Sequence, residues 1–213
     1  MRITELLDKR SIRIDGAPKS KNEALDQMVE LMAKSGKIND LEAYRQEVYR
    51  REEEGTTGVG EGIAIPHGKG AFVDKPGLAA MVVKDGVDYD SLDGEPVHLI
   101  FLIAAPNTKD NVHLDVLSKL SVLLMDEDFS RALQNAKSPE EFMKIVDEAD
   151  LFDLLDRLKR WFIDLVKSRV FVLMLVFIVL SAILIQRVFA LQIVNGQAYL
   201  DDYKLQIQKT KEV

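Results

Sequence analysis

The chain has 213 residues, of which 47% are hydrophobic and 30% charged, and its formal net charge is −7. It contains no cysteine, which excludes a cysteine-based zinc site and a thiol redox centre. The acidic balance disfavours nucleic acid as a partner, because nucleic-acid binding needs a basic footprint.

Charge divides the chain into two parts. Residues 1–150 carry 19 Lys and Arg against 29 Asp and Glu, a net charge of −10, whereas residues 151–213 carry 9 against 6, a net charge of +3. About 150 residues suffice for one well-buried domain, and the remaining sixty or so are too few for another of normal size. We therefore predict one domain over 1–150.

Signals for helices and strands alternate along this first part. Ser20 and Glu23 form a capping box, and Ser138 with Glu141 repeats it, with proline at the first helical position. Helices are predicted over 20–35, 41–54 and 138–148, and strands near 62–66, 77–84 and 97–105. The prediction is an α/β domain with a mixed sheet covered by helices on both faces.

Residues 55–70, GTTGVGEGIAIPHGKG, concentrate glycine around one histidine. The alternation over 63–65 indicates a short strand, and Pro66 cannot donate to a sheet, so the strand should end there with His67 at its tip. An imidazole with a pKa near ~6.5 keeps a free lone pair on one nitrogen around pH 7. Such a histidine can attack phosphorus, bind a metal or cap a turn.

The chain has only two other histidines, so a three-histidine metal site would need all of them. His98 begins an apolar run that indicates a buried strand, and we interpret it as a hydrogen-bonded residue at a strand edge. His113 precedes leucines at helical spacing, so it lies in the first turn of a helix, where it can face a neighbouring strand tip. We expect neither a metal nor a cofactor.

A candidate cation, Arg51, lies sixteen positions before His67, near the end of the helical run 41–54. The charged run 50–54 is also typical of a solvated, salt-bridged helix face. Phosphoryl transfer, however, needs a fixed positive charge beside the phosphoryl oxygens. The sequence has no Walker motif and no kinase glycine loop, so any phosphate chemistry must run through a side chain and not a bound nucleotide.

Residues 1–149 resemble the fructose/mannitol-type EIIA domain of the bacterial sugar phosphotransferase system. The matching elements, in order and spacing, are Arg51-Glu52, Thr57-Gly-Val-Gly60, Gly62-Ile-Ala-Ile-Pro-His67-Gly68 and His113-Leu114-x-x-Leu117-x-x-Leu120. The resemblance implies the EIIA type-2 fold, with His67 as the phosphorylated nucleophile and with Arg51 and His113 beside it.

The same resemblance implies partners and a role. His67 would accept a phosphoryl group from phospho-HPr and pass it to a cysteine of an EIIB component during sugar uptake. The stretch 101–106, FLIAAP, resembles the sugar-transport branch of the family more than its nitrogen-regulatory branch. The expected activity is therefore that of a phosphotransferase component, with fructose-type uptake favoured.

After Asp150 the pattern changes to that of a membrane anchor. Residues 151–169 combine apolar residues at helical spacing with five Lys and Arg, which predicts a basic amphipathic juxtamembrane helix. Residues 170–186 carry no charge, and with the apolar stretch beyond Arg187 they predict a transmembrane helix over 170–194 in contact with membrane lipid. Residues 195–213 would form a short extracytoplasmic tail.

Basic residues flank this segment mainly on its N-terminal side. The positive-inside rule then places the N-terminal domain in the cytoplasm, held at the inner membrane, with the C-terminus outside. Through the stretch Phe189-Ala-Leu-Gln192-Ile-Val-Asn-Gly196-Gln-Ala-Tyr199 above all, the segment from about 152 to 203 resembles the membrane anchor of elongation-type class B penicillin-binding proteins. No serine has lysine three residues later, so the transpeptidase activity of that family is not expected.

The two resemblances meet near Asp150 with no linker rich in Gly, Pro or Ser. A natural fusion, an engineered chimera and an artificial join of two gene fragments all fit this pattern. The alternative to a phosphocarrier is a non-catalytic, membrane-tethered module with a regulatory or cell-wall role.

Overall fold

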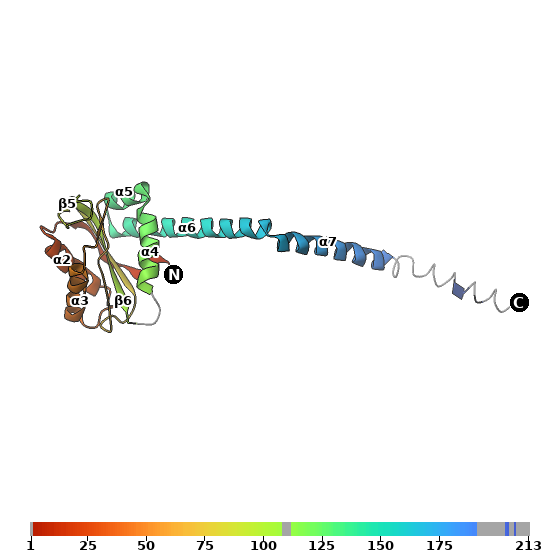
Figure 1. The fold of residues 1–213 in the computed structure, drawn as a ribbon, viewed down its shortest axis with the longest axis horizontal. Helices are drawn as coiled ribbons and strands as arrows, with labels where there is room; N and C mark the ends of the chain where they lie inside the picture. Colours follow the sequence, from red (N-terminus) through yellow and green to blue (C-terminus); the bar gives the residue numbers. More distant parts are fainter. Residues whose placement is uncertain (1, 108–111, 191–202, 205–206, 208–213) are drawn as a thin grey trace. The chain divides into compact units, whose positions relative to one another are not determined.

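A computed structural model describes residues 2–107, 112–190, 203–204 and 207 (Figure 1). The chain separates into two compact units, Met1–Leu154 and Leu155–Val213, and each is treated by itself.

A six-stranded sheet forms the centre of the first unit. Its strands are β1 (Leu7–Gly16), β2 (Gly58–Gly60), β3 (Ile63–Ala64), β4 (His67–Gly70), β5 (Gly77–Val87) and β6 (Val97–Pro106). The order is β1-β5-β6-β3-β2, and β4 also pairs with β6. β6 runs antiparallel to β5 and parallel to both β3 and β4, while β1 runs parallel to β5. The mixed sheet predicted from the sequence is confirmed.

Helices cover both faces of this sheet (Figure 1). One face carries α2 (Lys21–Ala33) and α3 (Leu41–Glu53), and the other carries α4 (Val112–Leu124) and α5 (Glu127–Asn135). The short α1 (Ile3–Leu6) precedes β1, and α6 (Pro139–Lys167) contributes Phe142 and Val146 to the same core as α4.

Alternation along β5 and β6 creates the two cores, because successive side chains of a strand point to opposite faces. Leu78, Ala80, Phe101 and Ile103 belong to the core beneath α4 and α6. The residues between them belong to the core beneath α2 and α3, namely Ala79, Met81, Ile100 and Leu102. Both strands are almost wholly apolar for this reason.

The helix that begins at Pro139 is longer than the sequence predicted. It was expected to end near Glu148, but α6 continues without a break from Pro139 to Lys167. No glycine or proline interrupts it after its first residue. Its residue Asp150 is buried, with 3% of its surface exposed, and accepts hydrogen bonds from the backbone N–H groups of Ile3 (2.7 Å) and Thr4 (3.3 Å).

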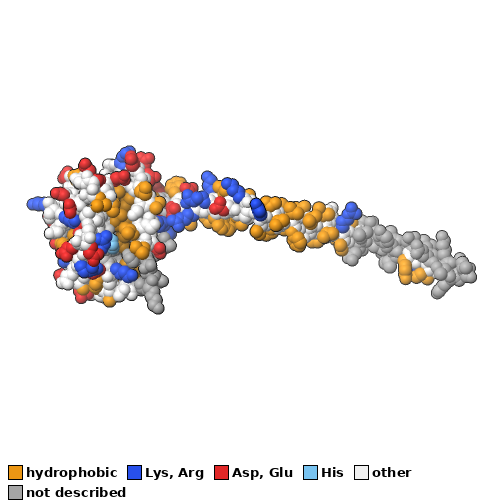
Figure 2. All heavy atoms as spheres, in the orientation of Figure 1, with side chains coloured by type: hydrophobic (Ala, Val, Ile, Leu, Met, Phe, Trp, Pro, Cys, Tyr) orange, Lys and Arg blue, Asp and Glu red, His pale blue; other side chains and the backbone are white. Residues whose placement is uncertain are grey.

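The second unit contains an apolar helix, α7 (Arg169–Phe189). The Ser168 side chain caps it by accepting a hydrogen bond from the Phe171 N–H at 3.1 Å. Within the described residues, α7 is the one helix long and apolar enough to cross a membrane, and none of its residues is buried in the structure. Hydrophobic side chains gather along it in Figure 2. Residues 191–194 of the predicted span lie outside the described residues.

We predict that Asp150→Ala lowers the stability of the first unit by about 3 kcal/mol. The substitution removes the acceptor of two backbone N–H groups and the ion pair with Lys119, whose Nζ lies 2.5 Å from Asp150 Oδ1. The matched control is Asp147→Ala, one turn earlier on α6, which removes an exposed ion pair with Arg2 and should cost about 1 kcal/mol or less. Denaturant unfolding of the two variants measures the difference, and equal losses would contradict the prediction.

Candidate functional site

The site depends on a close approach between α3 and β4. β4 has no side chain at Gly68, and a Cβ atom there would lie 2.9 Å from Tyr44 Cε2 and 3.1 Å from Val48 Cγ2. The buried Tyr44 hydroxyl donates a hydrogen bond to the Ile103 carbonyl at 3.1 Å, which ties α3 to the sheet. Residues 44, 48 and 51 follow one another at spacings of four and three on one helix face. The same packing therefore brings Arg51 to the start of β4.

His67 is the first residue of β4 and is partly buried there. The sequence predicted that the strand would end at Pro66 and leave His67 at a tip. β3 does end before Pro66, at Ala64, but the sequence did not predict that a further strand, β4, begins at His67 and pairs with the same neighbour β6. Pro66 lies between the two strands, and its carbonyl accepts a hydrogen bond from the Ile103 N–H at 2.9 Å.

Two contacts orient the His67 ring. Nδ1 lies 3.2 Å from the Ile65 carbonyl, which can only accept, so the hydrogen-bond network assigns the proton to Nδ1. Nε2 then keeps its lone pair and accepts a hydrogen bond from Arg51 Nε at 3.1 Å. Arg51 Nη1 also donates to the Gly55 carbonyl at 3.0 Å, which holds the guanidinium beside the ring.

The surroundings of His67 favour the neutral imidazole. Burial lowers the pKa of His67, and the nearby positive charge of Arg51 lowers it further, while the hydrogen bond to the Ile65 carbonyl acts in the opposite direction. A pKa below the usual ~6.5 leaves the ring neutral near pH 7. Nε2 then carries a lone pair and no proton, and this lone pair accepts the hydrogen bond from Arg51.

A buried polar network holds the end of α3 in place. Glu52 is 8% exposed, and its carboxylate accepts hydrogen bonds from the backbone N–H (2.9 Å) and the hydroxyl (2.5 Å) of Thr57. Lys21 Nζ lies 2.8 Å from the same carboxylate and 5.2 Å from the centre of the Tyr89 ring. The Tyr89 hydroxyl lies 3.2 Å from Thr57 Oγ1, and burial raises the pKa of Tyr89 far above its usual value. The turn that carries the Gly55 carbonyl is thus closed by the contact between Glu52 before it and Thr57 after it.

The charged run over 50–54 contains both surface residues and residues of the candidate site, and the sequence alone did not distinguish the two groups. Arg50 forms surface ion pairs with Glu47 and Glu54, which is the usual meaning of such a run. Arg51 points to His67, and Glu52 is buried, so neither belongs to the solvated face. The network of Lys21, Thr57 and Tyr89 was not predicted, because its only signal in the sequence was the motif elements Arg51-Glu52 and Thr57.

The other two histidines differ in what the structure describes. His98 lies in β6, and its Nδ1 is 3.1 Å from the Val83 carbonyl, so its interpretation as a hydrogen-bonded strand residue is confirmed. Along β6, His98 lies five residues before Ile103, which is the register partner of His67, so His98 is not part of the site. His113 lies in the first turn of α4, and its side chain is outside the described residues.

The arrangement offers a nucleophile and a cation for one reaction centre. The Nε2 lone pair of His67 can attack an electrophilic phosphorus, and the guanidinium of Arg51 can bind phosphoryl oxygens through charge-assisted hydrogen bonds. Among the described residues, no group of three or more His, Asp or Glu side chains is placed to hold a metal ion.

A family profile and several known proteins match the first unit. The profile described as "Phosphoenolpyruvate-dependent sugar phosphotransferase system, EIIA 2" matches residues 5–149. The chain is 47% identical over 150 residues to the fructose-specific EIIABC component of Bacillus subtilis, covering 70% of this chain and 24% of that protein. It is 36% identical over 137 residues to the fructose-specific EIIA component of Haloferax volcanii, covering 64% of this chain and 89% of that protein. The chain thus spans about a quarter of the Bacillus protein's length.

Solved structures match the same region. The nitrogen regulatory protein IIA-Ntr of Neisseria meningitidis aligns with a TM-score of 0.63 at 31% identity, covering 68% of this chain and 98% of that chain. A complex of enzyme IIA-mannitol with phosphorylated enzyme IIB-mannitol from Escherichia coli aligns with a TM-score of 0.59 at 26% identity, covering 67% of this chain and 99% of that chain.

We predict that His67 titrates below the usual ~6.5 and that Arg51→Ala moves its pKa upward, because the substitution removes a positive charge and admits water. The unfolded chain binds more protons than the folded one between the two pKa values, so His67 makes the fold less stable as the pH falls through that window. Histidine proton resonances followed over pH measure both effects. An unshifted His67 midpoint in Arg51→Ala would contradict the prediction.

Proposed function

Because this chain belongs to the EIIA 2 family of the phosphoenolpyruvate-dependent sugar phosphotransferase system, we propose that residues 1–150 form a phosphocarrier domain that is phosphorylated on His67. The observation that carries the proposal is the pair of contacts at the His67 ring. Nδ1–H is held by the Ile65 carbonyl, and Nε2 faces Arg51.

The transfer follows from this geometry. The Nε2 lone pair of His67 attacks the phosphorus of the donor's phosphohistidine and forms a new N–P bond. The donor's N–P bond breaks, and its electron pair returns to the donor imidazole. The His67 ring gains positive charge while Nδ1 keeps its proton, and the hydrogen bond to the Ile65 carbonyl stabilises this form. The second transfer reverses these steps toward the acceptor nucleophile.

Arg51 supplies the positive charge for the phosphoryl group. In the unphosphorylated protein, its Nε–H occupies the lone pair of Nε2 at 3.1 Å, so the guanidinium must turn toward the phosphoryl oxygens as the N–P bond forms. On the family resemblance, His113, which lies in the first turn of α4, is proposed as the third member of the site.

The partners are proposed from relatives. The donor is phospho-HPr, as in the family. The acceptor is an EIIB component, because a related enzyme IIA forms a complex with phosphorylated enzyme IIB in the Escherichia coli structure. Fructose-type uptake is favoured, because the relatives from Bacillus subtilis and Haloferax volcanii are both fructose-specific.

The second unit is proposed as a membrane anchor, with a basic juxtamembrane helix over 151–169, a span over 170–194 and an extracytoplasmic tail over 195–213. Support comes from the length and apolar surface of α7 and from the basic residues that precede it. In the proposed orientation, which follows the positive-inside rule, the phosphocarrier domain is on the cytoplasmic side of the inner membrane. The segment's likeness to the anchor of penicillin-binding proteins remains part of this proposal.

We predict that His67→Ala abolishes phosphate uptake from phospho-HPr and that Arg51→Ala slows it by roughly 10²-fold, the scale for losing one preorganised charge-stabilising group. Radiolabelled phosphate transfer measures both effects. Arg50→Ala is the matched control and should transfer at nearly the normal rate, because Arg50 pairs with Glu47 and Glu54 on the surface. Normal labelling of His67→Ala would remove the proposal.

We predict that the full chain stays with membranes during carbonate extraction, whereas a chain truncated after Leu154 is soluble. Leu175→Arg should weaken membrane retention, because a charge at the centre of a span costs about 2.5–3.5 kcal/mol on insertion scales. Leu92→Arg is the control, because it places the same charge at an exposed residue of the first unit. Recovery of the full chain in the soluble fraction without detergent would refute the anchor.

A further inference from the structure

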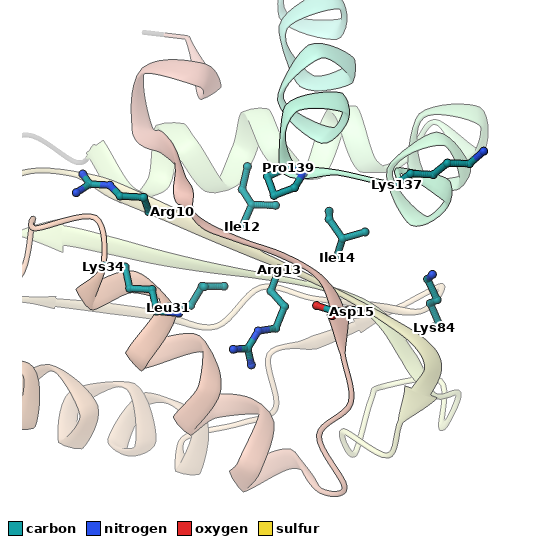
Figure 3. A pocket seen from close by; sticks show the side chains of 10 residues that line it. All are labelled: Arg10, Ile12, Arg13, Ile14, Asp15, Leu31, Lys34, Lys84, Lys137 and Pro139. Carbon is teal, nitrogen blue, oxygen red and sulfur yellow. The ribbon is translucent and has the colours of Figure 1, made fainter.

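The outer edge of β1 is open along a groove. In the sheet order, β1 pairs with β5 on one side, and no described strand pairs with its other side. A hollow of about 440 Å³ follows this edge (Figure 3). Ile12 and Ile14 of β1 point to the side of the hollow where Pro139, at the start of α6, forms one wall, and Leu31 of α2 belongs to the opposite wall. We call this hollow the β1 groove.

The β1 groove is basic in an acidic domain. Its lining contains five cationic side chains and a single acidic one, Asp15. The cations are Arg10, Arg13, Lys34, Lys84 and Lys137. Arg10 pairs with Asp8, and Arg13 donates to Gln27 at 3.1 Å. Within the described residues, the three lysines have no ion-pair partner, so their charges are available to a ligand.

The positive charges are spread along the groove and do not converge on one point. In Figure 3, Arg10 and Lys34 lie toward one end of the view, and Lys84 and Lys137 lie toward the other. A second hollow of about 470 Å³ shares these last two lysines and continues to Asn135. Such a trough suits an extended chain with several negative charges better than a small anion, which would need converging donors.

We propose that the β1 groove binds an extended acidic peptide segment of a partner protein, which adds to the free edge of β1 as a further strand. An edge strand presents unpaired backbone N–H and C=O groups, and an incoming peptide satisfies them while alternate side chains reach the two walls. Each wall combines an apolar residue with a cation, Leu31 with Lys34 and Pro139 with Lys137. A peptide that alternates apolar and acidic residues matches this lining.

This surface is separate from the phosphorylation site. β5 and β6 lie between β1 and β4 in the sheet order, so a peptide on β1 does not contact His67. The proposal therefore does not depend on phosphoryl transfer, and variants of the groove should keep a normal transfer rate.

The test uses the full chain in nonionic detergent and a fluorescent, end-capped peptide of sequence EVEVEVE. We expect saturable binding by fluorescence anisotropy at physiological salt. Lys84→Glu/Lys137→Glu should weaken this binding at least about tenfold, because the introduced carboxylates repel the glutamate side chains of the peptide. The control variant Lys75→Glu/Lys144→Glu makes the same change in charge at exposed residues outside the groove and should bind normally.

Amide hydrogen exchange distinguishes strand addition from general attraction between charges. The peptide should slow exchange of β1 amides, and the peptide EVEPEVE should bind more weakly, because proline lacks the N–H that an added strand donates. No binding, equal binding by the two double variants, or binding without protection of β1 would overturn the proposal. Displacement of the peptide by inorganic phosphate at constant ionic strength, without protection of β1, would make the groove an anion site and would also overturn it.

Discussion

The close approach of α3 to β4 is the constraint on which the site depends. Gly68 leaves room for Tyr44 and Val48, and the hydroxyl of Tyr44 fixes α3 to the centre of the sheet through the Ile103 carbonyl. One helical turn further, the same face carries Arg51 to the ring of His67. A side chain at position 68 would push α3 away, and Arg51 would move with it. The contact between Arg51 and His67 is thus a consequence of packing at a glycine.

Electrostatics around the site are arranged so that one cation remains directed at the histidine. Glu52, the carboxylate next to Arg51 in the chain, is satisfied by Lys21 and Thr57 in a buried network. Arg51 contacts neutral acceptors, the Gly55 carbonyl and Nε2 of His67. In these contacts no carboxylate neutralises the charge of Arg51, so the guanidinium can bind an arriving phosphoryl group. The low-dielectric surroundings that lower the pKa of His67 also strengthen this interaction.

The sequence predicted the fold class and the proximity of Arg51 to His67 because their signals are local. Alternating and continuous apolar runs indicated β5 and β6, and His67 was singled out by the glycines and the proline around it. β1 was missed because it is an edge strand whose polar residues, such as Arg10 and Arg13, hide its alternation. The burial of Glu52 could not be predicted, since its partners Lys21 and Tyr89 lie more than thirty positions away and meet it only in the folded domain.

The central claim is that Nε2 of His67 is the atom that carries the phosphoryl group. The protein can be labelled with ¹⁵N-histidine, phosphorylated by phospho-HPr and examined by long-range ¹H–¹⁵N and ³¹P NMR spectroscopy at alkaline pH. Since the Ile65 carbonyl holds the proton on Nδ1, we predict a single phosphohistidine, at Nε2 of His67. A phosphoryl group on Nδ1 of His67, or on His98 or His113, would contradict the account.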